Sequence, residues 1–497
     1  MRRSVVVSLG LLMAVLSGAC ANEAPGTLRA ATRALGASEL KSIQYAGTGT
    51  WFQFGQAPSP TLPWPAFNVT AFTATVNYDT PAARVEMERI QVVEPDRARP
   101  APVQQKPIQI LSGAYAWNMA VPAGAAPDAT PAPQPQPAAV EERTMEIWTT
   151  PHGFLKAAAA NNATSEPASG GGSDISFTMA GNHRFAGHIN AQNQVERVQT
   201  WIDNPVLGDT PVEITYSGYR EFNGVMFPGK IVRTQGGYPV LDITVSSVTK
   251  DPAVDLPVPD PVKSFTAPPV TATAEKLADG VWYIKGGTHH SVAIDQKDHI
   301  VVVEGPLDEA RSTAVIAKIK ETIPNKPIKS VINTHVHFDH SGGLRAYAAE
   351  GATIVTHDLN KPYYEKAWAA PRTINPDKLA QANKPATFET FSDKHVITDG
   401  SRAIEVYPIV GNGHNDAFAM IYLPKEKILM EVDAWAPLAP NQTPPPTPSP
   451  FAVNLYDNIH KLNLDVRQIA ALHGPRVATL DELKAAVGQG APRTTTH

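Results

Sequence analysis

Apolar and polar residues alternate through most of the first half of the chain. Between residues 28 and 248, apolar side chains recur at every second position more often than at every third or fourth, as in residues 241–245. Such alternation is typical of strands that bury one face. Asn223 and Gly224 separate two such runs, and both residue types tolerate the positive φ angles of a tight hairpin turn. We therefore predict that this half is mostly antiparallel β.

Segments rich in Pro, Ala or Gly interrupt this pattern. Residues 121–139 are rich in Ala and Pro and residues 168–173 carry three consecutive glycines, so we predict surface loops or disorder in both. Residues 251–274 hold six prolines and show neither periodicity, which is typical of a stiff linker. We expect an accessory β domain at 25–250, this linker at 251–274, and a second domain at 275–490.

Short apolar runs alternate with helical patterns after the linker. This order is typical of a layered α/β domain. Strands are expected at 281–284, 291–294, 300–303, 328–333, 354–355, 403–407, 417–423, 428–432 and 469–472, and helices at 308–322, 453–462 and 480–487.

Length and charge narrow the choice of partners. A chain of 497 residues is too long for a single hydrophobic core, which supports two or more domains. The net charge is −5 and no block of five or more Lys and Arg residues occurs. Nucleic acid and anionic membrane surfaces are recognised through such blocks. The partner expected is a small-molecule substrate, not a nucleic acid.

The first 21 residues have the pattern of an export signal. Arg2 and Arg3 precede an apolar run at 5–16, which is too short for a good spanning helix, and small residues follow it. Cleavage before Cys20 would resemble a bacterial lipoprotein signal, while Ala-Cys-Ala also fits ordinary signal cleavage. We expect an exported protein, periplasmic or anchored to the envelope, with membrane contact only through a lipid on Cys20. Cys20 is the only cysteine, so the chain can form no internal disulfide.

A dense histidine cluster follows the strand expected at 328–333. His335 and His337 lie two positions apart, so in an extended segment their side chains point the same way. Asp339 and His340 follow at once, and two glycines then permit a tight turn. Imidazole nitrogens and carboxylate oxygens without thiolates suit zinc, and equally iron or manganese. A divalent metal site is therefore predicted here.

Residues 334–343, Thr-His-Val-His-Phe-Asp-His-Ser-Gly-Gly, resemble the signature of the metallo-β-lactamase superfamily. The resemblance spans about residues 277–488 and implies an αββα sandwich of two sheets between helices. It also implies three later ligands: His414 after Gly-Asn-Gly, Asp433 at a strand end, and His473 before Gly474. The implied first metal site is His335, His337 and His414, the second is Asp339, His340 and His473, and Asp433 bridges them.

The resemblance implies a glyoxalase II-like hydrolase with two Zn²⁺ ions per chain. A hydroxide between two metal ions would attack an ester, thioester, lactone or related bond, and the catalytic Asp339 would orient it or carry its proton. Family members that hydrolyse β-lactams usually place Cys or Ser near Asp433, so β-lactam hydrolysis is an alternative. Persulfide oxygenation by a single iron and an envelope lipoprotein that only binds metal are the others.

Several further features have two interpretations. His289 and His290 lie in an expected hairpin and would either contact substrate or form a polar turn, while His357 is expected to be structural. Residues 437–450, with seven prolines, would form either a rigid wall over the metal site or an exposed loop. Residues 216–248 resemble the curved sheets of periplasmic lipoprotein carriers. Such a sheet would dock on the hydrolase in an accessory role, or bind an apolar ligand.

Overall fold

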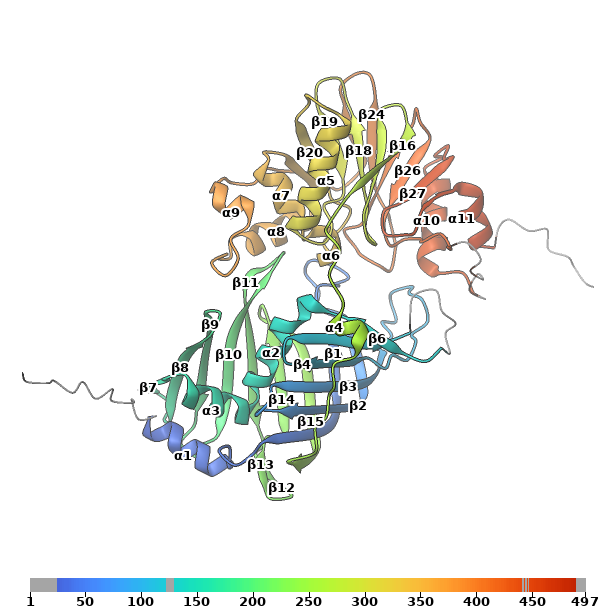
Figure 1. The fold of residues 1–497 in the computed structure, drawn as a ribbon. Helices are drawn as coiled ribbons and strands as arrows, with labels where there is room; N and C mark the ends of the chain where they lie inside the picture. Colours follow the sequence, from blue (N-terminus) through green and yellow to red (C-terminus); the bar gives the residue numbers. More distant parts are fainter. Residues whose placement is uncertain (1–24, 122–128, 440–441, 443–444, 446, 489–497) are drawn as a thin grey trace, which may run out of the picture.

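The computed structural model describes residues 25–121, 129–439, 442, 445 and 447–488. The export signal at 1–21, with Cys20, lies outside these residues. In Figure 1 the blue to green N-terminal half and the yellow to red C-terminal half form two lobes joined by the chain that follows α4 (Asp260–Lys263). Among the described residues, no helix combines the length and apolar character needed to cross a membrane.

A single antiparallel sheet of 13 strands forms the N-terminal half, as the alternating pattern predicts. Its order is β6-β5-β4-β3-β2-β1-β15-β14-β11-β10-β9-β8-β7. These strands are β1 (Ser42–Phe52), β2 (Ala66–Asn77), β3 (Ala82–Gln91), β4 (Ile108–Ser112), β5 (Tyr115–Ala120), β6 (Ala132–Pro135), β7 (Thr164–Pro167), β8 (Ser173–Met179), β9 (His183–Ile189), β10 (Val195–Asn204), β11 (Gly208–Ser217), β14 (Lys230–Gln235) and β15 (Tyr238–Lys250). The predicted hairpin is β12 (Arg220–Phe222) and β13 (Val225–Phe227), with positive φ at both turn residues, Asn223 and Gly224.

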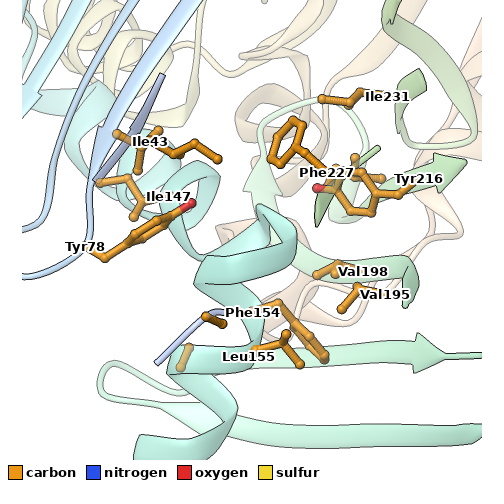
Figure 2. Close-up of a cluster of buried hydrophobic side chains, with 14 of the residues drawn as sticks. Ile43, Tyr78, Ile147, Phe154, Leu155, Val195, Val198, Tyr216, Phe227 and Ile231 are labelled. Atoms are coloured by element: carbon orange, nitrogen blue, oxygen red, sulfur yellow. The ribbon is translucent and has the colours of Figure 1, made fainter. Parts of the chain in front are cut away.

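Helices cover one face of this sheet. They are α1 (Gly26–Leu35), the short 3-10 helix η1 (Pro137–Ala139), α2 (Val140–Thr149) and α3 (Pro151–Ala160). Figure 2 shows Ile147, Phe154 and Leu155 of α2 and α3 in one buried cluster with strand residues such as Val198. Between the sheet and α2 lies a cavity of about 530 Å³, lined by aromatic side chains and by Arg233, which pairs with Glu142 and Glu146.

The expectation for residues 121–139 is partly wrong. Residues 122–128 lie outside the described part, but Ala132–Pro135 form the edge strand β6, which pairs with β5. Proline is tolerated in an edge strand because one side of that strand needs no ladder hydrogen bonds. Residues 168–172 form the turn between β7 and β8. Within the expected linker, Val262 of α4 packs on Ile110 and Trp117 of the sheet.

The C-terminal half is the expected αββα sandwich. A mixed sheet of seven strands has the order β16-β17-β18-β19-β20-β21-β22, and a sheet of six strands has the order β23 to β28. The strands are β16 (Thr273–Ala278), β17 (Val281–Lys285), β18 (Ser291–Asp295), β19 (Ile300–Val303), β20 (Ile328–Ile332), β21 (Thr353–His357), β22 (Phe388–Phe391), β23 (His395–Thr398), β24 (Ala403–Pro408), β25 (Ala419–Leu423), β26 (Ile428–Glu431), β27 (Gln468–Ala471) and β28 (Val477–Thr479). The helices are α5 (Glu309–Thr322), α6 (Phe338–Ser341), α7 (Leu344–Ala349), α8 (Asn360–Trp368), α9 (Lys378–Ala382), α10 (Pro450–Lys461) and α11 (Leu480–Ala486).

The all-apolar strand β19 shows why these layers form. Val301 and Val303 pack in the core between the two sheets, whereas Ile300 and Val302 pack against α5 and α7. A strand that is buried on both faces is apolar at every position. Helices α10 and α11 contribute to the core on the far side of the second sheet, through Leu455 and Leu483 among others.

The two halves contact each other through loops. Arg372 is buried and donates hydrogen bonds to the carbonyls of Asn204, Pro205 and Val206 at 2.9–3.3 Å. The carboxylate of Asp209 accepts hydrogen bonds from the backbone N–H of Thr373 at 2.9 Å. Backbone carbonyls that are buried without a donor are costly, so Arg372 stabilises this contact.

Replacing Arg372 with alanine removes the donor to these three carbonyls. We expect Arg372→Ala to lower the free energy of unfolding by about 1–3 kcal/mol, measured by thermal or urea denaturation. The matched control is Arg197→Ala on the exposed face of the sheet, where one ion pair with Glu213 spans 3.7 Å. That variant should change the stability by less than about 0.5 kcal/mol. Equal effects of both variants would contradict this role for Arg372.

Candidate metal centre

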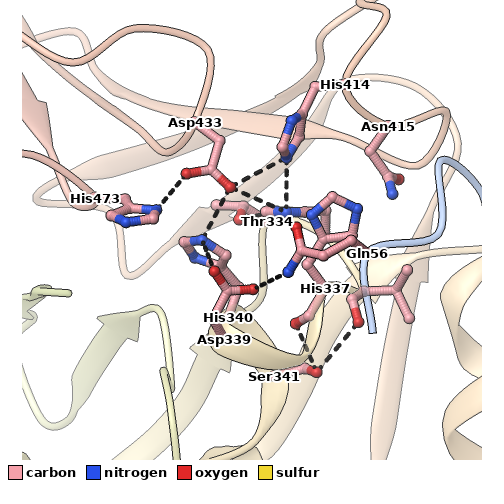
Figure 3. Close-up of polar contacts among 12 residues, drawn as sticks. Gln56, Thr334, His337, Asp339, His340, Ser341, His414, Asn415, Asp433 and His473 are labelled. Atoms are coloured by element: carbon pink, nitrogen blue, oxygen red, sulfur yellow. Dashed lines mark hydrogen bonds and ion pairs between the residues drawn. The ribbon is translucent and has the colours of Figure 1, made fainter. Parts of the chain in front are cut away.

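The histidine cluster lies where β20 ends. Residues 333–337 leave the strand in an extended conformation, and α6 begins at Phe338. His335 and His337 therefore project to the same side, with their ring centroids 4.4 Å apart. The turn into α6 brings Asp339 and His340 to the same pocket, as Figure 3 shows. Both His335 and His337 are buried.

One group of ligand atoms combines His335, His337, His414 and Asp433. One ligand atom from each lies within 4.8 Å of all the others. The Nε2 atoms of His335 and His414 face each other at 3.2 Å, and Oδ2 of Asp433 lies 3.1 Å from His414 Nε2. This group contains the three histidines expected for the first metal site.

The second group combines Asp339, His340 and His473 with His289, and its ligand atoms again lie within 4.8 Å of one another. His289 Nε2 is 3.4 Å from Asp339 Oδ2, and the His289 and His473 rings are 3.8 Å apart between centroids. The sequence places His289 only near the site, whereas the structure places one of its ring nitrogens within 4.8 Å of the ligand atoms of this group. The reason is that the hairpin between β17 and β18 folds over the cluster.

Asp433 lies between the two groups. Its Oδ2 atom is 3.0 Å from His340 Nε2 and 3.5 Å from His335 Nε2, while its Oδ1 atom is 2.5 Å from His473 Nδ1. The residue follows β26 with a positive φ of 52°, which turns its side chain toward the pocket. The structure thus brings together all seven residues named from the sequence, with Asp433 between the histidines of both groups.

Burial and charge set the protonation of these groups. Burial lowers the pKa of His335 to about 4, and burial beside His335 and His414 holds the pKa of His337 well below its usual value. Burial also acts on His340, but the carboxylates of Asp433 and Glu304 raise its pKa well above the usual value. Burial alone would raise the pKa of Asp433, yet the charge of His340 and hydrogen bonds from the surrounding imidazoles hold it well below its usual range.

The donor atoms fit a metal centre. Nδ1 of His337 is buried without a hydrogen-bond partner, although unpaired buried polar atoms are costly. Nε2 of His340 also forms no hydrogen bond, and the atom it faces is Oδ2 of Asp433 at 3.0 Å. The other ring nitrogen of each is held, because His337 Nε2 donates to the Ala57 carbonyl at 2.9 Å and His340 Nδ1 donates to Glu304 at 2.8 Å. Metal-ligating histidines usually have this arrangement, with one nitrogen held by the protein and the other facing the ion.

Residues 281–429 match the family model of the metallo-beta-lactamase superfamily. Residues 281–429 thus carry the sequence pattern of this superfamily, and they lie within the αββα sandwich. Its members are generally hydrolases.

Individual relatives resemble only part of the chain. The 2,4-dinitroanisole O-demethylase subunit alpha of Nocardioides sp. (strain JS1661) is 25% identical over 175 residues, which are 35% of this chain and 49% of that protein. The chain thus spans about half the length of this relative. Among solved structures, a metallo-beta-lactamase from Pontibacter korlensis is 18% identical and covers 44% of this chain and 98% of its own, with a TM-score of 0.34. A metallo-beta-lactamase from Hirschia baltica is 20% identical and covers 45% of this chain and 99% of its own, with a TM-score of 0.33.

Glu304 supports the candidate metal centre, and sequence reasoning missed it. The residue follows β19 with φ of 72° and is fully buried. Its Oε1 atom accepts a hydrogen bond from the Thr334 N–H at 2.8 Å, and its Oε2 atom accepts one from His340 Nδ1 at 2.8 Å. The sequence did offer a signal, because Glu304 directly follows the fully apolar strand β19. A carboxylate buried at such a position is rarely unpaired, so a functional partner could have been expected.

The other singled-out histidines lie outside both groups. His290 Nε2 donates to the Gly474 carbonyl at 2.9 Å, and the Gly286 N–H donates to its Nδ1 at 3.2 Å, so its role is structural. His357 ends β21 and accepts a hydrogen bond from the Leu359 N–H at 3.2 Å. Five residues of the proline-rich segment 437–450 lie outside the described part. Pro437, at its start, lies beside Gly474.

Replacing Glu304 with glutamine leaves one acceptor oxygen for two donors. We expect Glu304→Gln to raise the Kd for Zn²⁺ by about 10- to 100-fold, because His340 loses the group that orients it. Competition with a chromogenic chelator measures this constant. Glu321→Gln on α5 is the matched control, since within the part of the chain that the structure describes the exposed Glu321 pairs only with Lys318. An unchanged Kd in Glu304→Gln would contradict an orienting role.

Proposed function

We propose that the C-terminal half is a hydrolase with two zinc ions, which cleaves an ester, thioester, lactone or related bond. The observation that carries this proposal is the position of Asp433, whose carboxylate contacts His335 and His414 of one group and His340 and His473 of the other. A structural zinc site needs only four protein ligands. Two adjoining groups that share a carboxylate are instead typical of a catalytic pair of ions.

The residues have distinct roles in this proposal. His335, His337 and His414 would hold one ion, Asp339, His340 and His473 the other, and Asp433 both. Bound zinc would supply Lewis acidity and lower the pKa of water toward about 7. Asp339, whose pKa lies well below its usual range beside His289 and His340, is ionised at neutral pH. As an ionised carboxylate beside the second ion, Asp339 would orient the attacking water or carry its proton.

Asp433 also bears on the substrate. Cysteine or serine near this position is usual in the family members that hydrolyse β-lactams, so an aspartate favours the esterase, thioesterase or lactonase branch. The name of the Nocardioides relative adds the aryl methyl ether 2,4-dinitroanisole to the substrates to be tested.

The test combines metal analysis with a substrate panel on the purified full-length chain. We expect about two zinc ions per chain and hydrolysis of one class among a chromogenic ester, a thioester, a lactone, a cephalosporin and 2,4-dinitroanisole. His337→Ala should lower kcat/KM at least ~100-fold, since loss of a ligand exceeds the loss of a residue that orients one. The matched control, His460→Ala on the exposed surface of α10, should retain activity.

Other outcomes would contradict the proposal in distinguishable ways. A single iron with consumption of oxygen would indicate a persulfide dioxygenase-like enzyme. Turnover of the cephalosporin alone would indicate a β-lactamase. Metal retained without turnover of any substrate would favour an envelope protein that only binds metal.

For its location, we propose export and anchoring through Cys20. The support comes from the charged and apolar residues at 2–16 and from the small residues around Cys20. Mass spectrometry of the mature protein should find a chain that begins at a lipid-modified Cys20, and Cys20→Ser should release it from the membrane fraction. An unmodified N-terminus at a later residue would instead support ordinary cleavage and soluble export.

A further inference from the structure

A loop of the N-terminal sheet reaches the metal centre. Residues 53–65, which connect β1 and β2, run beside the segments that carry the ligands. The Phe338 N–H donates to the Gly55 carbonyl at 3.1 Å, and the Asp416 N–H donates to the Pro58 carbonyl at 2.8 Å. These contacts join the loop to the residues next to His337 and His414. The loop therefore borders the first group.

Two atoms of this loop contact metal-centre residues directly. Gln56 Nε2 donates to Asp339 Oδ1 at 2.8 Å, as Figure 3 shows. The Ala57 carbonyl accepts hydrogen bonds from His337 Nε2 and from Asn415 Nδ2, both at 2.9 Å. One loop thus holds a residue of each group.

From these contacts we propose that Gln56 is a positioning residue of the metal centre, and that the N-terminal half completes this centre through loop 53–65. The inference rests on the proposed function, since it concerns how the same centre is held. It replaces the expectation of a sheet that merely docks on the hydrolase.

The chemistry of both contacts suits this role. A carboxylate that has one oxygen bound to an amide N–H keeps its other oxygen directed at the ion, and Asp339 Oδ2 faces His289 and His340. The amide of Gln56 is neutral, so it orients Asp339 without neutralising its charge. The Ala57 carbonyl fixes the His337 tautomer with the proton on Nε2, which leaves Nδ1 free to bind metal.

Packing holds the loop in this place. Gly55 has φ of +75°, and a Cβ there would lie 2.6 Å from Cγ of Phe338, so only glycine lets the loop approach α6. The Phe338 ring packs edge-on against Phe54 and Trp64, with centroids 5.2 and 6.3 Å away. The loop therefore cannot withdraw without exposing Phe338, the residue between His337 and Asp339.

A second loop of the N-terminal half contacts the segment that carries His414. Both terminal guanidinium nitrogens of Arg97, Nη1 and Nη2, donate to the Asp416 carboxylate at 2.8 Å. A Cβ on Gly413 would lie 2.1 Å from the Ala98 carbonyl oxygen, so the two backbones are in close contact. The N-terminal half thus contacts ligand-bearing segments on β20–α6 and after β24.

The test compares Gln56→Met with Gln53→Met in the full-length chain. Methionine keeps the length of the side chain and removes the amide donor, while the Gln53 side chain makes no hydrogen bond among the described residues. Stepwise Zn²⁺ binding is measured by chelator competition, and the visible spectrum of the Co²⁺-substituted protein reports ligand geometry. Gln56→Met should weaken binding of the ion held by Asp339 about 10-fold or more and change the Co²⁺ bands. Gln53→Met should match the wild type.

The outcomes separate this inference from the proposed function. A wild type that binds two zinc ions and hydrolyses substrate, with unchanged zinc affinities and Co²⁺ spectrum in Gln56→Met, would overturn the positioning role alone. Equal losses in both variants would also overturn it, because they would indicate a general effect of the loop. A wild type that binds fewer than two ions would overturn the proposed function, and the inference with it.

Discussion

The carboxylate of Asp433 faces four imidazoles at distances of 2.5–3.5 Å, and most of the architecture around it serves to keep this arrangement buried. A buried charge is costly unless opposite charges and hydrogen bonds surround it. Here those partners come from three separate segments, which follow β20, β24 and β27, while Asp433 itself follows β26. Two sheets that pack face to face bring these ends together, so the αββα core is the condition for the centre.

The centre also depends on groups that hold its histidines from outside. Glu304 holds His340 from the end of β19, and the Ala57 carbonyl holds His337 from the other half of the chain. Each leaves one imidazole nitrogen facing the pocket. Imidazole rings can rotate and exchange tautomers, so ligand residues alone do not define a metal site. The surrounding contacts make the donor set specific.

The sequence was sufficient where the chemistry is local. The cluster at 335–340 and the fully apolar run at 300–303 predict a metal site and a layered core, because spacing and burial act over a few residues. The resemblance extended this to His414, Asp433 and His473. Helices α2 and α3 were not expected, because the strand pattern around them dominates. Proline begins the 3-10 helix η1, which leads into α2, and Pro151 begins α3.

The parts that could not be predicted depend on long-range contacts. Gln56 lies 283 positions from Asp339 in the chain, and no local pattern joins them. His289 enters the second group because a hairpin folds over the cluster, and a polar turn has the same sequence whether or not it does so. Similarly, β6 forms by pairing with the neighbouring strand β5, and the composition of residues 121–139 does not reveal this partner.

The same loops make the two sides of the centre unequal toward solvent. The side chain of His473 is 35% exposed and that of Asp339 28%, against 13% for His414 and none for His335. Loop 53–65 covers the centre beside His337, so water reaches it across the second group. A molecule that enters from solvent therefore meets Asp339 and His473 before it meets the buried histidines of the first group. The N-terminal half thereby sets the direction of approach.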